Sequence, residues 1–221
     1  MFNTPVPMKR SNKFGSNYWY VYSPKINRMV QLFSDLEYDH WLLIEGNPMI
    51  KKFCEQPKKI RVLVNGLYVT SIFDMWIQRF DGSQSFIEIK YLQDLNSTNP
   101  MSTRSIRQTT VQQKWCEENG YEYTLLTEQE IRSNTFLLDN LKTIIPFLRP
   151  NLITNEVDHR TINQIIGNQR LTIKQIRENC KHLSALRINQ TLYRMIYLGE
   201  INSDISEKAL SLATEVWKDG K

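Results

Sequence analysis

The chain has 221 residues and a mass of 26.2 kDa; 41% of its residues are hydrophobic and 23% are charged, which is typical of a globular protein with one large or two small domains. Its apolar runs are far shorter than the roughly 20 residues needed to cross a bilayer, so we expect no membrane span. The basic N-terminus is not followed by the apolar segment of a secretory signal, and we therefore expect a cytoplasmic protein.

The net charge is +5, with a pI near 9.0, and the surplus lies in the N-terminal quarter, where ten basic residues stand against five acidic ones up to Arg61. This balance fits an anionic partner such as nucleic acid, and it fits equally a solvated basic arm that only aids solubility. The three cysteines and three histidines are widely scattered, which predicts free core thiols rather than a zinc site or a disulfide framework.

An N-terminal arm rich in aromatic and basic residues precedes the first predicted helix. Tyr18, Trp19, Tyr20 and Tyr22 stand among lysines and arginines. Such interleaving occurs in nucleic-acid contacts. It occurs more often in a strand that packs onto a core, because aromatic side chains prefer burial, and this is the interpretation we favour.

The first predicted helix begins at the N-cap Ser34, and Glu37 completes a capping box. Three β-rich runs follow at 60–64, 67–79 and 85–91, separated by Asn-Gly and Asp-Gly dipeptides. Hairpin dipeptides between β-rich runs predict an antiparallel meander.

The next elements predict a strand that joins this sheet in parallel. A polar loop leads into a helix over 103–119, and a buried strand follows at 121–126. A second capping box, at Thr127 and Glu130, begins a helix that extends to Pro146. Because a crossover helix separates the last two strands, we expect an α/β fold with a mixed sheet flanked by helices.

The motif Arg149-Pro150-Asn151 marks the expected domain boundary, because the pattern changes there from mixed α/β to helices alone. We therefore predict one domain over 1–149, including the N-terminal arm, and a second over 150–221. Helices of the second domain are predicted to begin at Thr172, Ser184 and Asp204. The tight turn before Ser184 predicts a helix-turn-helix with at most a stunted wing.

The run at 85–91 carries the first chemically distinctive pattern. Strand alternation places Glu88 and Lys90 on one face. The preceding run is hydrophobic apart from Asp74, a residue that strand interiors disfavour. A strict two-residue turn at Asp81-Gly82 pairs Asp74 with Ile89. Asp74 and Glu88 therefore share a face only if the loop has an odd length, such as Asp81-Gly82-Ser83, or if a β-bulge intervenes.

Together these residues predict a site for a hard cation. The carboxylates of Asp74 and Glu88, with the backbone carbonyl of Ile89, suit Mg²⁺ or its surrogate Mn²⁺, and such ions neutralise charge in phosphodiester hydrolysis. Lys90 is expected to orient or activate the attacking water and to stabilise the transition state. The same residues also fit a surface ion-pair ladder, and Glu37 is explained as well by its capping box as by a place in the site.

Two helices carry candidate nucleic-acid contacts. Basic residues recur at helical spacing on the helix over 103–119, namely Arg104, Arg107 and Lys114. They fit a row of phosphate contacts or, equally, a solvated helix face. The helix from residue 185 carries polar side chains off its apolar stripe that are able to contact bases or phosphates, namely Arg187, Asn189, Gln190 and Arg194.

A series of short motifs runs through residues 25–145. They are Ser34-Asp35-Leu36-Glu37, Phe53-Cys54-Glu55-Gln56-Pro57, Phe73-Asp74, Glu88-Ile89-Lys90, Asn119-Gly120-Tyr121 and Leu125-Leu126-Thr127-Glu128. This series resembles the TnsA-type endonuclease subunits of heteromeric cut-and-paste transposases, which are part of the PD-(D/E)xK restriction-endonuclease-like superfamily. The sequence departs from the superfamily pattern at Phe73, where a proline often precedes the aspartate.

The resemblance implies a restriction-endonuclease-like domain followed by a winged-helix module. It implies an active site of Glu37, Asp74, Glu88 and Lys90 with Mg²⁺, in an endonuclease that cuts the strand at the 5′ ends of a mobile element. Its implied partners are the double-stranded DNA of the element's ends, a TnsB-type RNase H-like transposase that cuts and joins the 3′ ends, and a TnsC-type AAA+ ATPase regulator. All would meet in a bacterial cytoplasm, at the nucleoid. If so, the polar side chains of the helix from residue 185 fit docking to the ATPase as well as they fit contacts with DNA bases.

Two other interpretations stay open. One is a non-catalytic DNA-binding or regulatory protein built on a nuclease-like scaffold, for which the second domain supplies the function. The other is a stand-alone restriction or repair nuclease, which should cut DNA unaided and dimerise to cut both strands.

Overall fold

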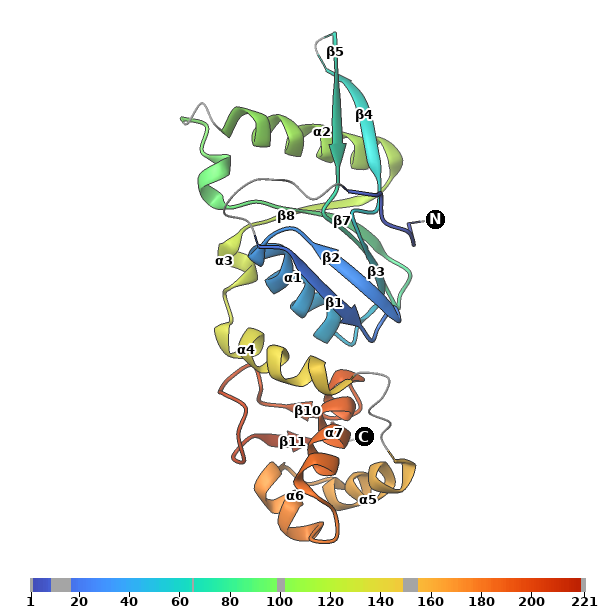
Figure 1. Cartoon of the computed structure of the whole chain (residues 1–221), viewed down its shortest axis with the longest axis vertical. Coiled ribbons are helices and arrows are strands. Elements are labelled where there is room, and N and C mark those ends of the chain that lie inside the picture. The colour runs from blue at the N-terminus through green and yellow to red at the C-terminus, as the bar shows by residue number, and fades with distance from the viewer. Residues whose placement is uncertain (1, 9–16, 65, 99–101, 149–154, 220–221) are drawn as a thin grey trace. The chain divides into compact units, whose positions relative to one another are not determined.

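The computed structural model describes residues 2–8, 17–64, 66–98, 102–148 and 155–219, and the chain divides into two compact units (Figure 1). The first unit comprises Met1–Ile44 and Met49–Ser133, and the second comprises Glu45–Pro48 and Asn134–Lys221. The boundary expected at Arg149-Pro150-Asn151 lies outside the described residues. None of the described helices is long and apolar enough to span a membrane.

The first unit begins with a hairpin of β1 (Trp19–Ser23) and β2 (Arg28–Leu32), followed by α1 (Asp35–Gly46). The Trp19 ring stacks on Tyr38 of α1 with 4.0 Å between ring centroids, and its indole N–H donates to Asp35 Oδ1 over 2.9 Å. The predicted packing of the aromatic arm onto the core is therefore confirmed for Trp19.

A four-stranded mixed sheet forms the centre of this unit. Its strands are β3 (Ile50–Glu55), β6 (Met75–Arg79), β7 (Gln84–Ile89) and β8 (Glu122–Leu126), in that order. The first two pairings are antiparallel, and β7 pairs with β8 in parallel. The parallel pairing requires a crossover, which the chain makes through the short 3₁₀ helix η1 (Leu92–Leu95) and the helix α2 (Thr103–Asn119). The predicted mixed sheet flanked by helices is confirmed.

The predicted three-strand meander is wrong in its details. The run expected as one strand over 67–79 is broken at Phe73 and Asp74 into β5 (Leu67–Ile72) and β6. Strand β5 pairs only with β4 (Lys59–Val64), so these two form a separate hairpin beside the sheet, and β3 takes the place next to β6. At the break, the Phe73 side chain is completely buried and packs against Trp115 of α2, with 5.6 Å between ring centroids, while its N–H donates to the carbonyl of Lys58.

The β4–β5 hairpin and α2 enclose an apolar cluster with the sheet. Its fully or almost fully buried members are Cys54, Ile60, Phe73, Trp76, Phe86, Val111 and Cys116. Trp115 and Tyr121 stack at its margin, with 5.9 Å between ring centroids. Cys54, Cys116 and Cys180 are all buried free thiols, as the sequence predicts.

The helix expected from Thr127 to Pro146 is two helices. Thr127 and Glu130 form the predicted capping box, but α3 ends after one turn (Glu128–Ile131). Asn134 then caps α4 (Thr135–Ile144) by accepting a hydrogen bond from the N–H of Leu137, and the 3₁₀ helix η3 (Ile145–Leu148) follows. Asparagine is among the residues that most favour the N-cap position, so a separate helix beginning after Asn134 is favoured over an extension of α3.

The second unit combines helices with a small sheet. Its elements after η3 are α5 (Glu156–Ile166), β9 (Leu171–Thr172), α6 (Ile173–Asn179), α7 (Ala185–Tyr197), β10 (Asn202–Ser203) and β11 (Glu215–Trp217). The strands pair in the order β10-β11-β9. The predicted N-caps Thr172 and Ser184 are confirmed. The helix predicted from Asp204 is wrong, because the Asp204 carboxylate accepts a hydrogen bond from the N–H of Glu215 and closes the turn that leads to β11.

A buried ion pair ties the first hairpin to the central sheet. The Arg28 guanidinium donates to both carboxylate oxygens of Glu55 on β3, over 2.6 and 2.5 Å, and the Glu55 side chain is 1% exposed. A buried charge whose partner is removed is left without its solvation or its counter-ion.

We therefore predict that Arg28→Ala lowers the free energy of unfolding by about 3 kcal/mol or more, because it leaves the Glu55 carboxylate buried and unpaired. Lys114→Ala is the matched control in the same unit. Lys114 pairs with Glu118 on the exposed face of α2, and loss of such a pair costs at most about 0.5 kcal/mol. Urea unfolding followed by tryptophan fluorescence measures both, and equal losses in the two variants would contradict the assignment.

Candidate active site

The register of the β6–β7 hairpin decides which side chains meet. Met75 pairs with Ile87, and Gln78 pairs with Gln84. The N–H of Arg79 donates to the carbonyl of Ser83, so the loop between them has three residues, 80–82. The loop therefore has the odd length that the predicted site requires, although it begins one residue earlier than Asp81-Gly82-Ser83.

Continuing this register by one residue places Asp74 opposite Glu88. Backbone hydrogen bonds join Arg79 with Ser83, and in an antiparallel ladder such bonds recur at every second residue pair. The pair of Asp74 and Glu88 is therefore one without backbone hydrogen bonds. In pairs of that kind the two side chains approach most closely. The ladder would next pair Phe73 with Ile89, but the chain has already turned away into β5. The Asp74 carboxylate replaces the missing carbonyl and accepts the Ile89 N–H at Oδ2 over 2.8 Å.

Glu88 is completely buried, and both of its carboxylate oxygens accept hydrogen bonds. Lys90 and Gln108 donate to Oε1, the latter over 2.7 Å, and Gln112 donates to Oε2 over 2.7 Å. The contact between Lys90 and Glu88 confirms that the two share a face of β7. Three donors, one directly after β7 and two on α2, thus fix the carboxylate in one orientation.

The backbone of Ile89 presents its carbonyl on the Asp74 side of β7. The N–H of Lys90 donates across the parallel pairing to the carbonyl of Leu126 over 3.0 Å. Because the carbonyl of a strand residue and the next N–H point in opposite directions, the Ile89 carbonyl faces away from β8. Its own N–H, which bonds Asp74, lies on that same side. The Ile89 carbonyl, the predicted backbone ligand, therefore points toward the side of β7 on which Asp74 lies.

Glu37 is held as a helix cap beside this group. Its carboxylate accepts from the N–H of Phe33 over 3.0 Å and from the hydroxyl of Ser34 over 3.2 Å, and its own N–H donates to Ser34 Oγ over 3.1 Å. The predicted cap from Ser34 to the Glu37 N–H is confirmed, whereas the Glu37 carboxylate bonds the N–H of Phe33 instead of that of Ser34. Among the residues that the structure describes, no three His, Cys, Asp or Glu side chains group closely enough to share one metal ion, so the structure does not join Glu37 to Asp74 and Glu88 as a third ligand.

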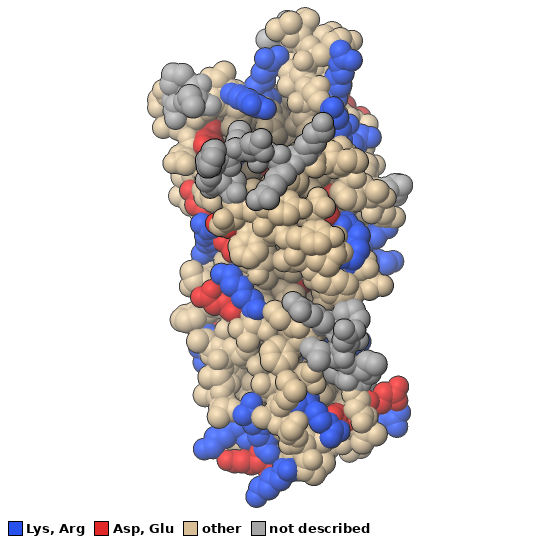
Figure 2. Space-filling model, in the orientation of Figure 1, with Lys and Arg blue, Asp and Glu red and all other residues tan. Residues whose placement is uncertain are grey.

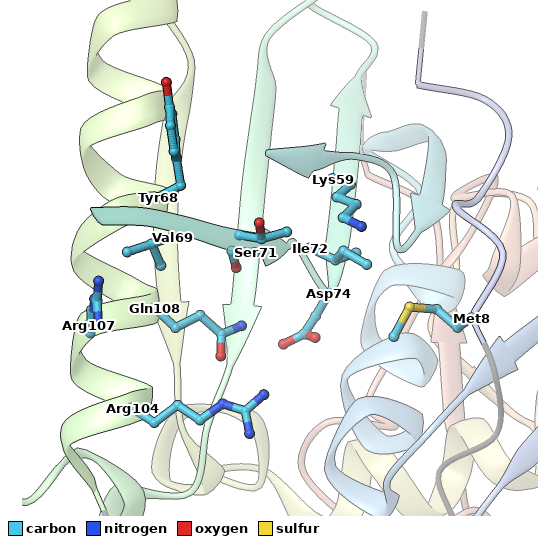
Figure 3. Close-up of a pocket in the computed structure, with 11 residues that line it drawn as sticks. Met8, Lys59, Tyr68, Val69, Ser71, Ile72, Asp74, Arg104, Arg107 and Gln108 are labelled. Carbon is cyan, nitrogen blue, oxygen red and sulfur yellow. The ribbon is translucent and has the colours of Figure 1, made fainter. Parts of the chain in front are cut away.

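Two cavities open onto the site and share Arg104 and Gln108 of α2. The larger, of about 560 Å³, is lined by Asp74 together with Lys59 and Arg107, and Figure 3 shows Arg104 and Gln108 extending from α2 toward the Asp74 carboxylate. The smaller, of about 370 Å³, is lined by Glu37 and Lys90. Asp74 is therefore accessible from one cavity and Glu37 and Lys90 from the other, and the same face of α2 lines both cavities.

The electrostatics of the site are dominated by buried carboxyl groups. Burial and the neighbouring charge of Asp74 raise the pKa of Glu88 to about 8 and that of Glu37 to about 7. Burial also raises the pKa of Asp74, against the opposing effect of Lys90 and of the Ile89 N–H. Burial alone would lower the pKa of Lys90, but the charges of Asp74 and Glu88 raise it above its ordinary value. One ammonium therefore faces three carboxyl groups.

The donor set fits a hard divalent cation. Carboxylate oxygens and a backbone carbonyl are the ligands that Mg²⁺ and Mn²⁺ accept, whereas no cysteine or histidine is part of the set. Burial and the neighbouring carboxyl charge raise these pKa values, and a cation would stabilise the ionised carboxylates. Asp74, Glu88 and the Ile89 carbonyl are the groups that would hold it.

Two glutamines of the site were missed in the sequence. Gln108 and Gln112 lie four and eight residues after Arg104, so all three share one face of α2. Gln112 is completely buried, and it also bonds Ser71 over 2.9 Å while accepting from the Tyr123 hydroxyl over 3.2 Å. The four-residue spacing was a detectable signal, but polar residues at that spacing equally describe a solvated helix face.

The candidate nucleic-acid residues differ in their surroundings. Arg104 and Arg107 line the larger cavity, whereas Lys114 does not line it and pairs with Glu118 over 3.7 Å. In the second unit, Arg187 binds Asp158 through two hydrogen bonds of 2.6 and 2.8 Å, and Asn189 accepts from Arg177 over 3.0 Å. Gln190 is half-buried and Arg194 is exposed.

The mixed sheet with its flanking helices, and the aspartate placed opposite Glu-x-Lys, are consistent with a restriction-endonuclease-like fold. Residues 47–128 match the family model for the TnsA-like endonuclease N terminal domain, which contains Asp74, Glu88 and Lys90. The match supports a TnsA-type endonuclease and confirms the resemblance seen in the sequence. No curated protein matches the chain.

The raised carboxyl pKa values predict how stability changes with pH in the absence of divalent ions. Folded Glu88 keeps its proton up to about pH 8, whereas in the unfolded chain it loses the proton near 4.5. The folded state therefore binds more protons between these values, and stability falls as the pH rises from about 5 to about 8, by up to about 1.4 kcal/mol per pH unit for each such group.

Glu88→Gln removes this group while keeping its shape, so its stability should fall less steeply over the same range. Urea unfolding of both proteins at pH 5, 6, 7 and 8, with a chelator present, measures the difference. Parallel profiles would show that the Glu88 carboxyl has an ordinary pKa.

Proposed function

We propose that the protein is the Mg²⁺-dependent DNA endonuclease subunit of a TnsA-like transposase, and that it cleaves the strand at the 5′ ends of a mobile element. One observation carries the proposal. The β6–β7 register sets the Asp74 carboxylate opposite Glu88, with the Ile89 carbonyl and the Lys90 ammonium beside them. The family match over residues 47–128 supports the same function.

In this proposal Asp74, Glu88 and the Ile89 carbonyl hold the ion, and Gln112 keeps Glu88 oriented. When bound, Mg²⁺ supplies positive charge to the phosphate oxygens and lowers the pKa of the attacking water. Gln108 and Lys90 both bond Glu88 Oε1, so this oxygen is freed for an ion only when their side chains turn toward the adjoining cavities.

Lys90 is expected to act in its protonated form. Its raised pKa keeps the ammonium charged at neutral pH, so it is a hydrogen-bond donor and a positive charge, and not a general base. It lines the smaller cavity, where a water or a phosphate oxygen would meet it. Its role would be to position the attacking water and to stabilise the charge that develops on the phosphate.

The proposed partners follow from the transposase assignment. They are the double-stranded DNA of the element's ends, an RNase H-like transposase of the TnsB type and an AAA+ ATPase of the TnsC type, in the bacterial cytoplasm. The second unit, with its confirmed α6 and α7 starts and its three-stranded sheet, is proposed as a winged-helix module. The internal bonds of Arg187 and Asn189 leave Arg194 as the more available candidate contact on α7.

The surroundings of Asp74 bear on the alternative of a non-catalytic scaffold. A relic would be expected to show an apolar pocket there. Instead Asp74 accepts a hydrogen bond from Ile89 and lines a cavity with Lys59, Arg104 and Arg107. This polar, cationic wall supports a site that meets phosphate.

The first test is Mn²⁺ binding by calorimetry. Wild type should bind the ion, and Asp74→Ala should lose binding because a charged ligand is removed. Asp74→Asn is the more conservative variant, because its amide oxygen can still accept the Ile89 N–H. It should fold normally and bind at least about tenfold more weakly.

Asp81→Asn is the matched control, since Asp81 is an exposed aspartate of the β6–β7 loop whose carboxylate accepts a hydrogen bond from the N–H of Ser83 in the same turn. It should bind Mn²⁺ like wild type. If wild type binds no ion, the titration is repeated with a short DNA duplex, and absence of binding there too would contradict the proposal.

The second test concerns Lys90. Lys90→Ala should reduce strand cleavage in the assembled transposase by about 10²-fold or more, because it removes a positive charge that acts on the transition state. The variant should keep Mn²⁺ binding, since Asp74 and Glu88 remain. Cleavage of one strand on an end-labelled duplex measures the loss, and cleavage at the wild-type rate would exclude the proposed role of Lys90.

A further inference from the structure

The two faces of the β4–β5 hairpin have different surroundings. Ile60 and Ser71 form a cross-strand pair on the inner face, and both are buried. Val62 and Val69 form the next inner pair and pack against the apolar cluster under α2. This face explains why the hairpin stays next to α2, as Figure 1 shows.

The outer face is exposed and basic. Its cross-strand pairs are Arg61 with Thr70 and Leu63 with Tyr68, and Lys59 lies at its base. Leu63 is 54% exposed and Tyr68 is 61% exposed. The Arg61 guanidinium lies 4.0 Å from the centre of the Tyr68 ring, an arrangement that holds the arginine against the strand surface while its N–H groups stay available.

This outer face continues into the candidate active site. Strand β5 ends at Ile72, two residues before Asp74. Lys59, Tyr68 and Thr70 line the same cavity as Asp74 and as Arg104 and Arg107 of α2. Figure 3 shows Lys59 and Ile72 on one side of the cavity and the α2 side chains on the other.

Four cations of this surface have no carboxylate partner within the part of the chain that the structure describes. They are Lys59, Arg61, Arg104 and Arg107, and Asp74 is the only carboxylate among the described residues that line the cavity. Figure 2 shows Lys and Arg side chains gathered on the part of the surface formed by β4, β5 and α2. Four like charges at one surface favour a polyanion and disfavour a second copy of the same surface.

We propose that the outer face of the β4–β5 hairpin binds the sugar-phosphate backbone of duplex DNA next to the bond that is cut. The proposal rests on the proposed function, because it deepens the substrate contacts of that same site. Lys59 and Arg61 contact successive phosphates, and Tyr68 keeps the Arg61 guanidinium in place. Each six-residue strand is about 20 Å long, which matches about six base pairs of a duplex.

Contacts of this kind have a recognisable salt dependence. Each phosphate that a cation neutralises releases counter-ions, so the affinity falls with salt concentration along a log–log slope of about 0.9 per contact. Removal of one such cation should weaken binding to every sequence alike and reduce the slope by about 1.

The test is the binding of a labelled duplex of unrelated sequence to the full chain, measured by fluorescence anisotropy between 50 and 200 mM salt without divalent ions. We expect Arg61→Ala and Lys59→Ala each to bind several-fold more weakly and with a slope reduced by about 1. Arg61→Lys keeps the charge and should retain most of the slope. Lys51→Ala is the matched control, an exposed lysine of β3 that does not line the cavity, and it should bind like wild type.

Several results would overturn the proposal. They are a wild-type chain that does not bind the duplex at 50 mM salt, an Arg61→Ala chain with unchanged affinity, and equal losses in Arg61→Ala and Lys51→Ala. An Arg61→Ala chain that loses self-association in sedimentation but keeps DNA affinity would overturn it too, because the surface would then be a contact between copies.

Failure of the proposed function gives a different result. If Asp74→Asn leaves Mn²⁺ binding unchanged while Arg61→Ala still weakens DNA binding and lowers the slope, the hairpin is supported as a DNA surface and only the nuclease assignment falls. Conversely, normal Mn²⁺ binding in Arg61→Ala together with unchanged DNA affinity overturns the hairpin and leaves the nuclease assignment intact.

Discussion

The hydrogen bond from the Ile89 N–H to the Asp74 carboxylate determines the arrangement of the site. The β6–β7 ladder ends at the pair of Met75 and Ile87, and beyond it the backbone of β7 needs a new acceptor. A side chain supplies that acceptor, so the chain is free to leave the sheet at Phe73 and to form the β4–β5 hairpin. The same bond holds the carboxylate within reach of Glu88. One interaction therefore ends a ladder, permits a branch in the fold and orients an acidic group.

This arrangement concentrates buried carboxyl groups, and neutral amide side chains satisfy part of their hydrogen-bonding capacity. Glu88 has no exposure, and its oxygens are bonded by two glutamines in addition to Lys90. An amide satisfies a buried lone pair without adding a positive charge, so it does not compensate the ionised form of the carboxyl group. Ionisation of these carboxyl groups is therefore costly without a cation, which is the expected property of a site that is completed by a metal ion.

The sequence predicted those features that depend on neighbours along the chain. The cap at Ser34 and the capping box at Thr127 each follow from a few adjacent residues, and the structure contains both. The odd length of the β6–β7 loop was a condition set by the site hypothesis, and the structure meets it. The break at Phe73 was not predictable in this way. Residues 67–79 are rich in β-forming residues interrupted by Asp74, and the strand ends where Phe73 packs against α2, far along the chain. Likewise Asp204 is a residue type that often begins a helix, but its carboxylate instead accepts a hydrogen bond from Glu215, the first residue of β11.

The role of α2 shows why the remainder of the site also escaped a linear interpretation. Arg104, Gln108 and Gln112 follow one another at intervals of four, and their exposure falls from an exposed cation, through a half-buried amide, to an amide with no exposure at all. This gradient exists only because α2 crosses the end of the sheet next to Glu88. The outermost residue faces the cavity that an anion would enter, and the innermost holds the carboxylate that a cation would need. A single helix face therefore matches the two charges of the proposed reaction, the phosphate outside and the metal ion within.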